Sequence, residues 1–268
     1  MSELGESGRS LRRGPSLRGL AMKAAAVPRE LRFRATRRRI ARRYLAGNGL
    51  EIGALHRALP LPTGATARYV DRLDSDGLRE HYPELSKYAL VNVDIIDDGE
   101  TLGTQPDSSA DFIIANHFIE HTEDPLGTLS SHLRVLKPGG ILYLAVPDRR
   151  RTFDSDRPPT PLEHVIQDHR EGPAWSRAAH LEEWARLVDK VPVTEIPARV
   201  RALEESAYSI HFHVWTPAEF TMLLERARDD GLPFEIEKLQ SNDHEFIAIL
   251  RRSGAAGHQA GSAVRQKL

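Results

Sequence analysis

The amino-acid sequence predicts an α/β fold, with a doubly wound sheet of seven strands that is mostly parallel and closes with a C-terminal antiparallel hairpin. Short apolar runs alternate with helical patterns from about residue 48 onwards. Residues 141–146 are apolar throughout, and a turn-rich segment joins the last two runs. With 268 residues, of which 40% are hydrophobic, the chain can bury a substantial core.

Each predicted strand is a short apolar run that ends in polar residues. The run 141–146 is of the kind buried on both faces of a sheet, which indicates a central strand. Ser241, Asn242 and Asp243 form a turn that should pair the last two strands antiparallel. The seven predicted strands are residues 49–53, 68–71, 88–94, 111–116, 141–146, 234–239 and 245–250.

Two helices of the predicted core have strong start signals. Asp124 is a good N-cap before Pro125, so a helix is predicted from there to about residue 136. Thr216 and Glu219 form a capping box with proline at the first helical position, and this second helix should run to about residue 230.

Residues 148–215 do not continue the alternation and are predicted to be a helical insertion after strand five. They are rich in Arg, Pro and His at first. The expected helices of the insertion span about residues 163–169, 175–188 and 196–208.

The N-terminal 45 residues are strongly basic. They hold 13 Lys or Arg against 3 Glu, whereas the whole chain has a formal net charge of -1. The part through Pro28 is predicted to be disordered, and residues 30–45 to form a helix. The arm is either a solvated tail with a packing helix, or a surface for anionic lipid headgroups or nucleic acid. The apolar residues of its helix are Leu31, Ile40, Tyr44 and Leu45.

Composition excludes several classes of protein. The absence of cysteine excludes disulfides, thiolate metal sites and cysteine nucleophiles. No apolar run of about 18 residues and no secretory signal pattern is visible, so we expect a cytoplasmic protein whose only membrane contact would be peripheral. The expected organisation is a basic arm at 1–45, one domain at 46–252 and a flexible tail at 253–268.

Acidic and polar residues follow the predicted strands in a regular order. Glu51 ends the first strand, and Gly53 follows where a side chain would block close approach of a ligand. Asp71 ends the second strand about 20 residues later, where a carboxylate can accept both hydroxyls of a ribose. Asp94 follows the third strand. The fourth strand leads into a segment that holds Asn116, His117 and His121.

Over about residues 48–150, this order resembles the class I S-adenosylmethionine-dependent methyltransferases, particularly a branch with histidine after strand four. The resemblance implies a Rossmann-like fold, methyl transfer and S-adenosylmethionine as the cofactor. It also implies that Asp94 accepts the adenine amino group and that Ile95 covers the ring. Leu55 departs from the pattern, because it stands where the family has a second glycine. The cofactor-binding residues expected on this basis are Glu51, Gly53, Ala54, Asp71, Asp94, Ile95, Asn116, His117 and His121.

An NAD-binding oxidoreductase is the natural competitor, since it shares the acidic strand ends. A dinucleotide site needs closely spaced glycines, so that the pyrophosphate can sit on backbone amides at a helix N-terminus. The next glycine after Gly53 is Gly64, and two prolines intervene. The sequence therefore favours a nucleoside sulfonium over a cofactor that carries phosphate.

The insertion offers groups that could remove a proton from an acceptor hydroxyl. His164 and Asp168 have helical i, i+4 spacing and form either a base with its orienting carboxylate or a solvent-facing polar pair. His211 and His213 alternate along an extended segment, which predicts that they lie on one side of it. Asp154 is a further candidate. His164, His211 and His213 could also bind Zn or Fe, but no three-ligand spacing is recognisable, and we predict no metal.

The insertion from residue 146 to 164 is similar to that of methyltransferases that accompany glycan-assembly enzymes. By this resemblance the expected acceptor is a hydroxyl of a saccharide or glycolipid. The three consecutive arginines 149–151 are either solvated surface charge or a group that attracts an anionic acceptor. The alternative that is not an enzyme is a module that binds the cofactor, has lost catalysis and acts as a partner subunit. A nucleic-acid partner is not favoured, because the chain outside the arm is acidic.

Overall fold

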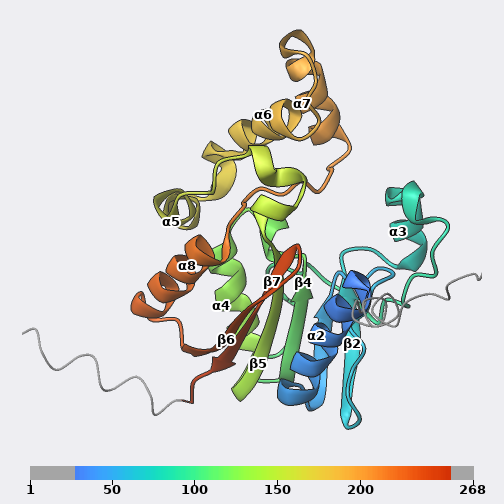
Figure 1. Cartoon of the computed structure of the whole chain (residues 1–268), viewed down its shortest axis with the longest axis vertical. Coiled ribbons are helices and arrows are strands. Elements are labelled where there is room, and N and C mark those ends of the chain that lie inside the picture. Colours follow the sequence, from blue (N-terminus) through green and yellow to red (C-terminus); the bar gives the residue numbers. More distant parts are fainter. Residues whose placement is uncertain (1–27, 255–268) are drawn as a thin grey trace, which may run out of the picture.

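The computed structural model describes residues 28–254, which contain a seven-stranded sheet in the order β3-β2-β1-β4-β5-β7-β6 (Figure 1). Strands β1 to β5 run parallel, and β7 pairs antiparallel with both β5 and β6. The predicted fold class and the closing hairpin are confirmed. The strands are β1 Gly47–Ile52, β2 Ala65–Asp71, β3 Ile95–Ile96, β4 Ala110–Asn116, β5 Leu136–Pro147, β6 Phe234–Asn242 and β7 Glu245–Arg252.

The helices agree with the predicted ones to within a few residues. They are α2 Arg29–Tyr44, α3 Ser75–His81, α4 Pro125–Val135, α5 Leu162–Glu171, α6 Arg177–Leu187, α7 Ile196–Glu205 and α8 Pro217–Asp229. Only α3 was not predicted, although Asp74 caps it by accepting a hydrogen bond from the Gly77 amide at 2.8 Å. Short 3₁₀ helices are Pro83–Leu85, Ile119–His121, Arg149–Arg151, Phe153–Asp156, Pro173–Trp175 and Val193–Glu195.

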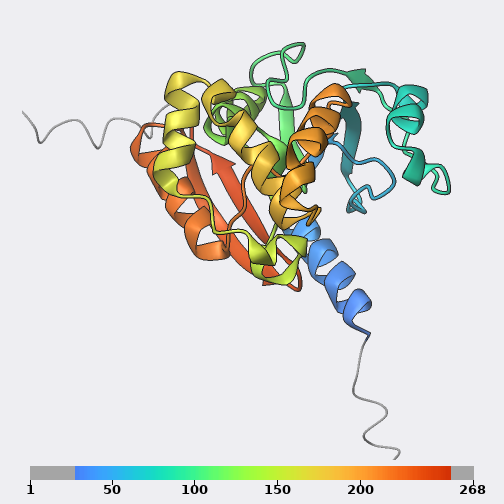
Figure 2. The same ribbon diagram turned by 90° about the horizontal axis from the view of Figure 1, so that it is seen from above.

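Helices cover both faces of the sheet, as Figures 1 and 2 show. The alternation along β4 divides the core in two: Ile113 and Ala115 pack with α4 and α8, whereas Phe112 and Ile114 pack with α2. Both clusters are closed to solvent. This double cover explains why the central strands read as continuous apolar runs.

Helix α2 belongs to the domain, because Ile40, Ala41 and Leu45 are buried against the sheet. The expected boundary at residue 46 therefore moves to the start of α2. Of the predicted apolar residues of this helix, Leu31 is exposed. The predictions for residues 1–27 and 255–268 lie outside the described residues. Within residues 28–254, no helix is both long enough and apolar enough to cross a bilayer.

The third strand was predicted in the wrong place. Two amides before Asp94 bond to other partners: the Val91 amide donates to the Leu55 carbonyl at 2.7 Å, and the Val93 amide to Ser75 Oγ at 3.2 Å, whereas the Asp94 amide donates to the Tyr69 carbonyl of β2 at 2.9 Å. Because the Val91 and Val93 amides cannot also join the sheet ladder, β3 is reduced to two residues that begin at Ile95.

The insertion lies above the carboxyl edge of the sheet in Figure 1. Helix α5 joins the main core through Val165 and Ile166. Helices α6 and α7 share a separate apolar cluster, Leu181, Trp184, Leu203, Ile210 and Phe212.

Candidate active site

The register of β1 with β2 and β4 places Gly53, Asp71 and Asn116 side by side at one edge of the sheet. Ile52 at the end of β1 is paired with the residue before Asp71 on β2 and with the residue before Asn116 on β4. Gly53, Asp71 and Asn116 are therefore the next residues on three neighbouring parallel strands. Such an edge is where open α/β sheets bind ligands.

The loop after β1 has the left-handed backbone that a close turn requires. Gly53 has φ +62°, a conformation that glycine adopts without steric cost. Leu55 also lies in the left-handed region, with φ +49°. The leucine that replaces the expected second glycine thus keeps the glycine-like turn, at a strain of about 1–2 kcal/mol.

A cavity of about 650 Å³ opens at this edge. One wall is α2, which contributes Arg34, Arg37 and Arg38, and the other is the loop 53–60. The residues after β4 close its inner end. Six predicted cofactor residues line the cavity, namely Glu51, Gly53, Ala54, Asn116, His117 and His121.

Glu51 lies at the inner end of the cavity and is 1% exposed. Its Oε1 accepts hydrogen bonds from the Leu59 amide at 2.8 Å and from Asn116 Nδ2 at 3.4 Å. Burial raises the pKa of Glu51 to about 7. Glu51 Oε2 and Asn116 Oδ1 are buried and have no hydrogen-bond partner within residues 28–254. The cavity thus presents two free acceptors to a ligand that donates.

Asp71 lies at the predicted edge, outside the cavity lining, and burial raises the pKa of its carboxyl group. Asp94 lies two residues behind this edge, because it precedes β3, and its Oδ2 accepts from the Tyr69 amide at 2.9 Å. Ile95 is 8% exposed and packs in the core, whereas the exposed residue of β3 is Ile96. The placement of Asp94 and Ile95 at the edge is therefore corrected.

A buried ion-pair network holds the segment after β4. Arg37 donates to both carboxylate oxygens of Glu245, from Nε to Oε1 at 2.9 Å and from Nη2 to Oε2 at 2.5 Å. His117 Nε2 lies 2.9 Å from Glu245 Oε2. Asn242 donates to the same carboxylate at 2.7 Å. Arg37 and His117 help to lower the pKa of Glu245 to about 2, against the opposing effect of burial. Glu245 thus connects α2, the closing hairpin and His117 through hydrogen bonds to one carboxylate. The backbone of His117 is left-handed, with φ +50°.

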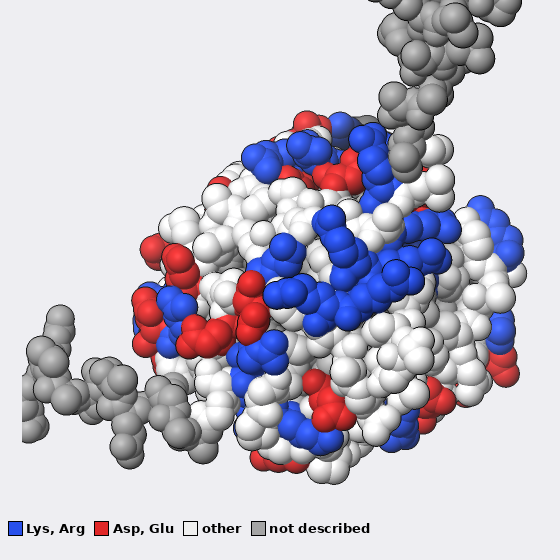
Figure 3. Space-filling view, turned by 60° about the horizontal axis from the view of Figure 1, so that its bottom comes forward, with Lys and Arg blue, Asp and Glu red and all other residues white. Residues whose placement is uncertain are grey.

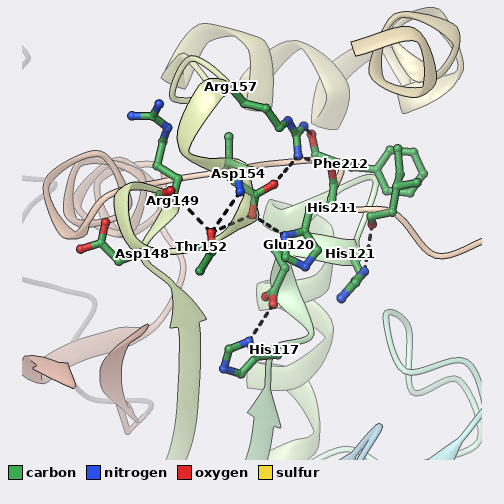
Figure 4. Close-up of polar contacts among 12 residues, drawn as sticks. His117, Glu120, His121, Asp148, Arg149, Thr152, Asp154, Arg157, His211 and Phe212 are labelled. Atoms are coloured by element: carbon green, nitrogen blue, oxygen red, sulfur yellow. Dashed lines mark hydrogen bonds and ion pairs between the residues drawn. The ribbon is translucent and has the colours of Figure 1, made fainter. Parts of the chain in front are cut away.

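Beside the cavity, Asp154 and His211 form a buried pair (Figure 4). His211 Nδ1 lies 2.8 Å from Asp154 Oδ2, and Arg157 holds the other carboxylate oxygen at 3.0 Å. The His211 ring meets the ring of His121, which lines the cavity, with centroids 4.6 Å apart. His121 Nδ1 lies 2.9 Å from the Ile210 carbonyl, and burial lowers the pKa of His121 to about 3.

The other predicted catalytic residues lie in a separate cluster. His164 Nε2 is 3.2 Å from Asp168 Oδ2, so the predicted pair forms, but it does not line the cavity. His213 Nε2 is 3.0 Å from the same oxygen. His211 and His213 therefore serve two different clusters, although they alternate along one segment.

A family model described as a methyltransferase domain matches residues 29–227. The chain belongs to this methyltransferase family. No curated protein matches the chain. Together with the fold, this membership identifies a S-adenosylmethionine-dependent methyltransferase and leaves the oxidoreductase alternative without support.

Solved structures of methyltransferases are similar to the chain at low identity. A S-adenosylmethionine-dependent methyltransferase from Aquifex aeolicus is 14% identical, with 87% of this chain and 96% of that chain covered and a TM-score of 0.45. One from Methanosarcina mazei is 18% identical, with 80% and 97% covered and a TM-score of 0.45. The family membership rests on the model match.

Sequence reasoning missed Glu120 of this methyltransferase. It is 1% exposed, neither carboxylate oxygen has a hydrogen-bond partner within the described chain, and burial raises its pKa well above the usual value. One carboxylate oxygen of Glu120 lies within 4.8 Å of a ring nitrogen of His121 and of a ring nitrogen of His211. The sequence feature that could have indicated Glu120 is its spacing of three residues from His117, at which a helical turn brings two side chains together.

The cavity fits the cofactor of the family. S-adenosylmethionine carries an ammonium group and a sulfonium, and the free acceptors Glu51 Oε2 and Asn116 Oδ1 suit a cationic donor. The loop 53–60 contains no second glycine and no helix N-terminus that would cradle a phosphate. The acceptor atoms of the cavity thus agree with a nucleoside sulfonium.

Proposed function

We propose that this methyltransferase transfers the methyl group of S-adenosylmethionine to a hydroxyl of a saccharide or glycolipid, with His211 as the base. The observation that carries the proposal is the Asp154–His211 pair, which lies directly behind the cavity-lining His121. When bound, the cofactor supplies a methyl group that its sulfonium has activated. The protein has to align the acceptor and take its proton.

Gly53, Asp71 and Asn116 would hold the cofactor along the carboxyl edge. For adenine we propose Asp98 in place of Asp94, because Asp98 follows the end of β3 and its side chain is exposed. The next residue, Gly99, packs so closely on the end of β1 that an added Cβ would lie 2.7 Å from Ile52 Cγ2. This contact places the segment beside the end of β1.

Asp71→Ala is expected to weaken S-adenosylmethionine binding by roughly 10–100-fold, since a hydrogen bond to a charged group contributes about 1.5–3 kcal/mol. Calorimetry on the folded variant measures the change. Asp94→Ala is the matched comparison and should change the affinity less, because its carboxylate bonds to the Tyr69 amide. An unchanged affinity in Asp71→Ala would remove Asp71 from the site.

Affinity for S-adenosylmethionine is expected to rise from pH 6 to pH 8. Glu51 has a pKa of about 7, and a cationic ligand nearby favours its ionised form, so binding releases a proton below this pH. The increase should approach about tenfold, because roughly a tenth of such a group is ionised at pH 6. Glu51→Gln should flatten the profile. A profile equally steep in Glu51→Gln would assign the effect to another group.

His211 is suited to act as a base because its proton position is fixed. Asp154 accepts from Nδ1–H, which leaves the lone pair on Nε2 to receive the acceptor proton. Arg157 and Thr152 in turn hold Asp154. An imidazole that a carboxylate orients is the type of base that an aliphatic hydroxyl needs, whereas a phenol or an amine needs less help.

The surface next to this base supports a saccharide acceptor. Phe153 is 55% exposed, and its ring centroid lies 4.9 Å from that of His211, so it offers an apolar face beside the reacting hydroxyl. Arg149 and Arg151 belong to the 3₁₀ turn that precedes Phe153 and would attract an anionic acceptor. The similarity of the insertion to glycan-associated methyltransferases points the same way.

An acceptor screen with labelled S-adenosylmethionine tests the proposal. Saccharides, lipid-linked saccharides, phenols and carboxylates are compared at equal concentration. We expect label in the saccharide or glycolipid pool alone. Transfer only to phenols or carboxylates would overturn the assignment of the acceptor while leaving the methyltransferase intact.

Helix α2 provides a basic surface for the approach of a membrane-bound acceptor. Lys and Arg side chains gather on the face drawn in Figure 3. Arg34 and Arg38 line the cavity, so this surface and the active site are continuous. Each basic residue near an anionic membrane contributes about 1 kcal/mol. The exposed arginines of α2 are Arg29, Arg32, Arg34, Arg38, Arg39, Arg42 and Arg43.

Full-length protein is therefore expected to co-sediment with anionic vesicles more strongly than with neutral ones, and less at high salt. A variant with Arg32, Arg39 and Arg42 changed to glutamine should lose much of this binding, since none of the three has an acidic partner among the described residues. Equal sedimentation of the two proteins would end the membrane proposal.

A further inference from the structure

Three imidazoles and one carboxylate converge in the insertion, away from the cavity. His164 and Asp168 come from α5, His180 from α6, and His213 from the segment before α8. His164 Nε2 lies 2.9 Å from His180 Nε2 and 3.2 Å from Asp168 Oδ2, and His213 Nε2 lies 3.0 Å from that oxygen. All four ligand atoms lie within 4.8 Å of one another.

These separations are close to those of a four-coordinate metal site. Metal–ligand bonds of about 2.0–2.1 Å put neighbouring ligand atoms of a tetrahedron roughly 3.3 Å apart. The separations of 2.9, 3.2 and 3.0 Å fall slightly below this value. A shift of a few tenths of an ångström would bring these three contacts to the spacing of a zinc site, and the remaining pairs of ligand atoms lie within 4.8 Å.

The outer contacts orient the ligand atoms inward. His213 Nδ1 lies 3.0 Å from the Thr122 carbonyl and has to donate to it, which orients the ring so that Nε2 points at Asp168. Asp168 Oδ1 accepts from Ser176 Oγ at 2.7 Å. Carbonyl and hydroxyl partners of this kind are typical of the groups behind metal ligands.

Without a cation, the cluster places like groups against each other. The Nε2 atoms of His164 and His180 face each other at 2.9 Å, and a contact between two imidazole nitrogens can hold only one proton. Asp168 and His213 are fully buried, so water cannot solvate them. A metal ion at the centre would satisfy all four groups at once.

Two tryptophan rings pack against the cluster, the buried Trp215 and the exposed Trp175. Trp215 stacks on His213 with centroids 5.6 Å apart, and Trp175 lies 5.0 Å from His164. The side chain of His164 remains 23% exposed and gives the only partly open side of the four. On the Trp215 side, the buried ring limits the access of water to a bound ion.

We propose that His164, Asp168, His180 and His213 form a structural Zn²⁺ site. Three imidazoles exclude Mg²⁺ and Ca²⁺, which prefer oxygen ligands, and a closed set of four protein ligands is typical of structural rather than catalytic zinc. The site would cross-link α5, α6 and the segment that carries His211. It therefore fixes the insertion over the active site and goes beyond the proposed methyl transfer.

Metal analysis of the full-length protein, with any affinity tag removed, tests the site. We expect about one equivalent of Zn²⁺ per chain after purification with zinc in the medium. Asp168→Asn and His180→Ala should lose it. His169→Ala is the matched control, because His169 lies on the same helix but is 47% exposed and pairs with Asp124. It should keep the metal.

Two further measurements do not depend on a ligand variant folding. Co²⁺ added to metal-free wild-type protein should give the intense visible absorption of four-coordinate cobalt. Ser176→Ala, which keeps all four ligands but removes the hydroxyl that bonds to Asp168 and to the Pro173 carbonyl, should weaken zinc binding by about 10–100-fold.

Wild-type protein that carries no zinc and gives no cobalt spectrum would overturn the proposal and leave a His213–Asp168 ion pair in its place. Zinc that survives His180→Ala but is lost in His211→Gln would also overturn it, since the metal would then belong to Glu120, His121 and His211. Neither result would touch the assignment of the methyltransferase, which rests on other residues.

Discussion

His211→Gln is expected to lower kcat for a hydroxyl acceptor by about 10²–10⁴-fold, the usual contribution of a positioned base. The physical reason is that Nε2 of His211 takes the acceptor proton while Asp154 holds Nδ1–H at 2.8 Å. Asp154→Asn should cost less, because it leaves the ring in place but disturbs its orientation. Single-turnover rates with the acceptor found in the screen give the measurement.

Binding separates this role from a structural one. His211 does not line the cavity, so the Kd of His211→Gln for S-adenosylmethionine should lie within about twofold of the wild-type Kd. A variant that keeps its cofactor affinity but loses turnover fits the base. Unchanged turnover would show that the proton leaves by another route, and His121 would be the next residue to test.

Arg37→Met is expected to destabilise the fold by about 3–5 kcal/mol, the usual cost of stranding one charge of a buried ion pair. Arg37 binds both oxygens of Glu245, whose side chain is fully buried. Urea unfolding of the variant and the wild type measures the difference. The helix of the predicted basic arm would thus be essential to the domain rather than an addition to it.

The pH dependence identifies the cause. The pKa of Glu245 falls from 4.5 to about 2 on folding, so its contribution is complete above the unfolded value and is lost as the pH falls towards 2. The deficit of Arg37→Met should therefore be largest above about pH 5 and shrink in acid. Adding Glu245→Gln should recover part of the loss at neutral pH. A deficit that is constant with pH would mean that packing of the Arg37 stem, not its charge, matters.

The sequence predicted the edge of the sheet well because strand ends are local features. Gly53, Asp71 and Asn116 each follow an apolar run, and parallel pairing brings such residues together without further information. The capping signals at Asp124 and Thr216 were equally local, and both helices start where these signals placed them.

What the sequence could not predict depends on long-range partners. Asp94 looks like a strand-end acid until the Val91 amide is seen to bond to Leu55, which delays β3 to Ile95. Arg37 and Glu245 are 208 residues apart, so no spacing rule connects them. His211 and His213 differ by two residues, yet their partners Asp154 and Asp168 come from different turns of the insertion. Tertiary packing decides each of these contacts.

Calorimetry of the purified full-length protein with S-adenosylmethionine, S-adenosylhomocysteine and NADH tests the central claim most directly. Both adenosyl ligands should bind at one site, with affinity reduced in Asp71→Ala, and NADH should give no heat of binding. Binding of NADH with no response to either adenosyl ligand would contradict the account of this edge as a methyltransferase site.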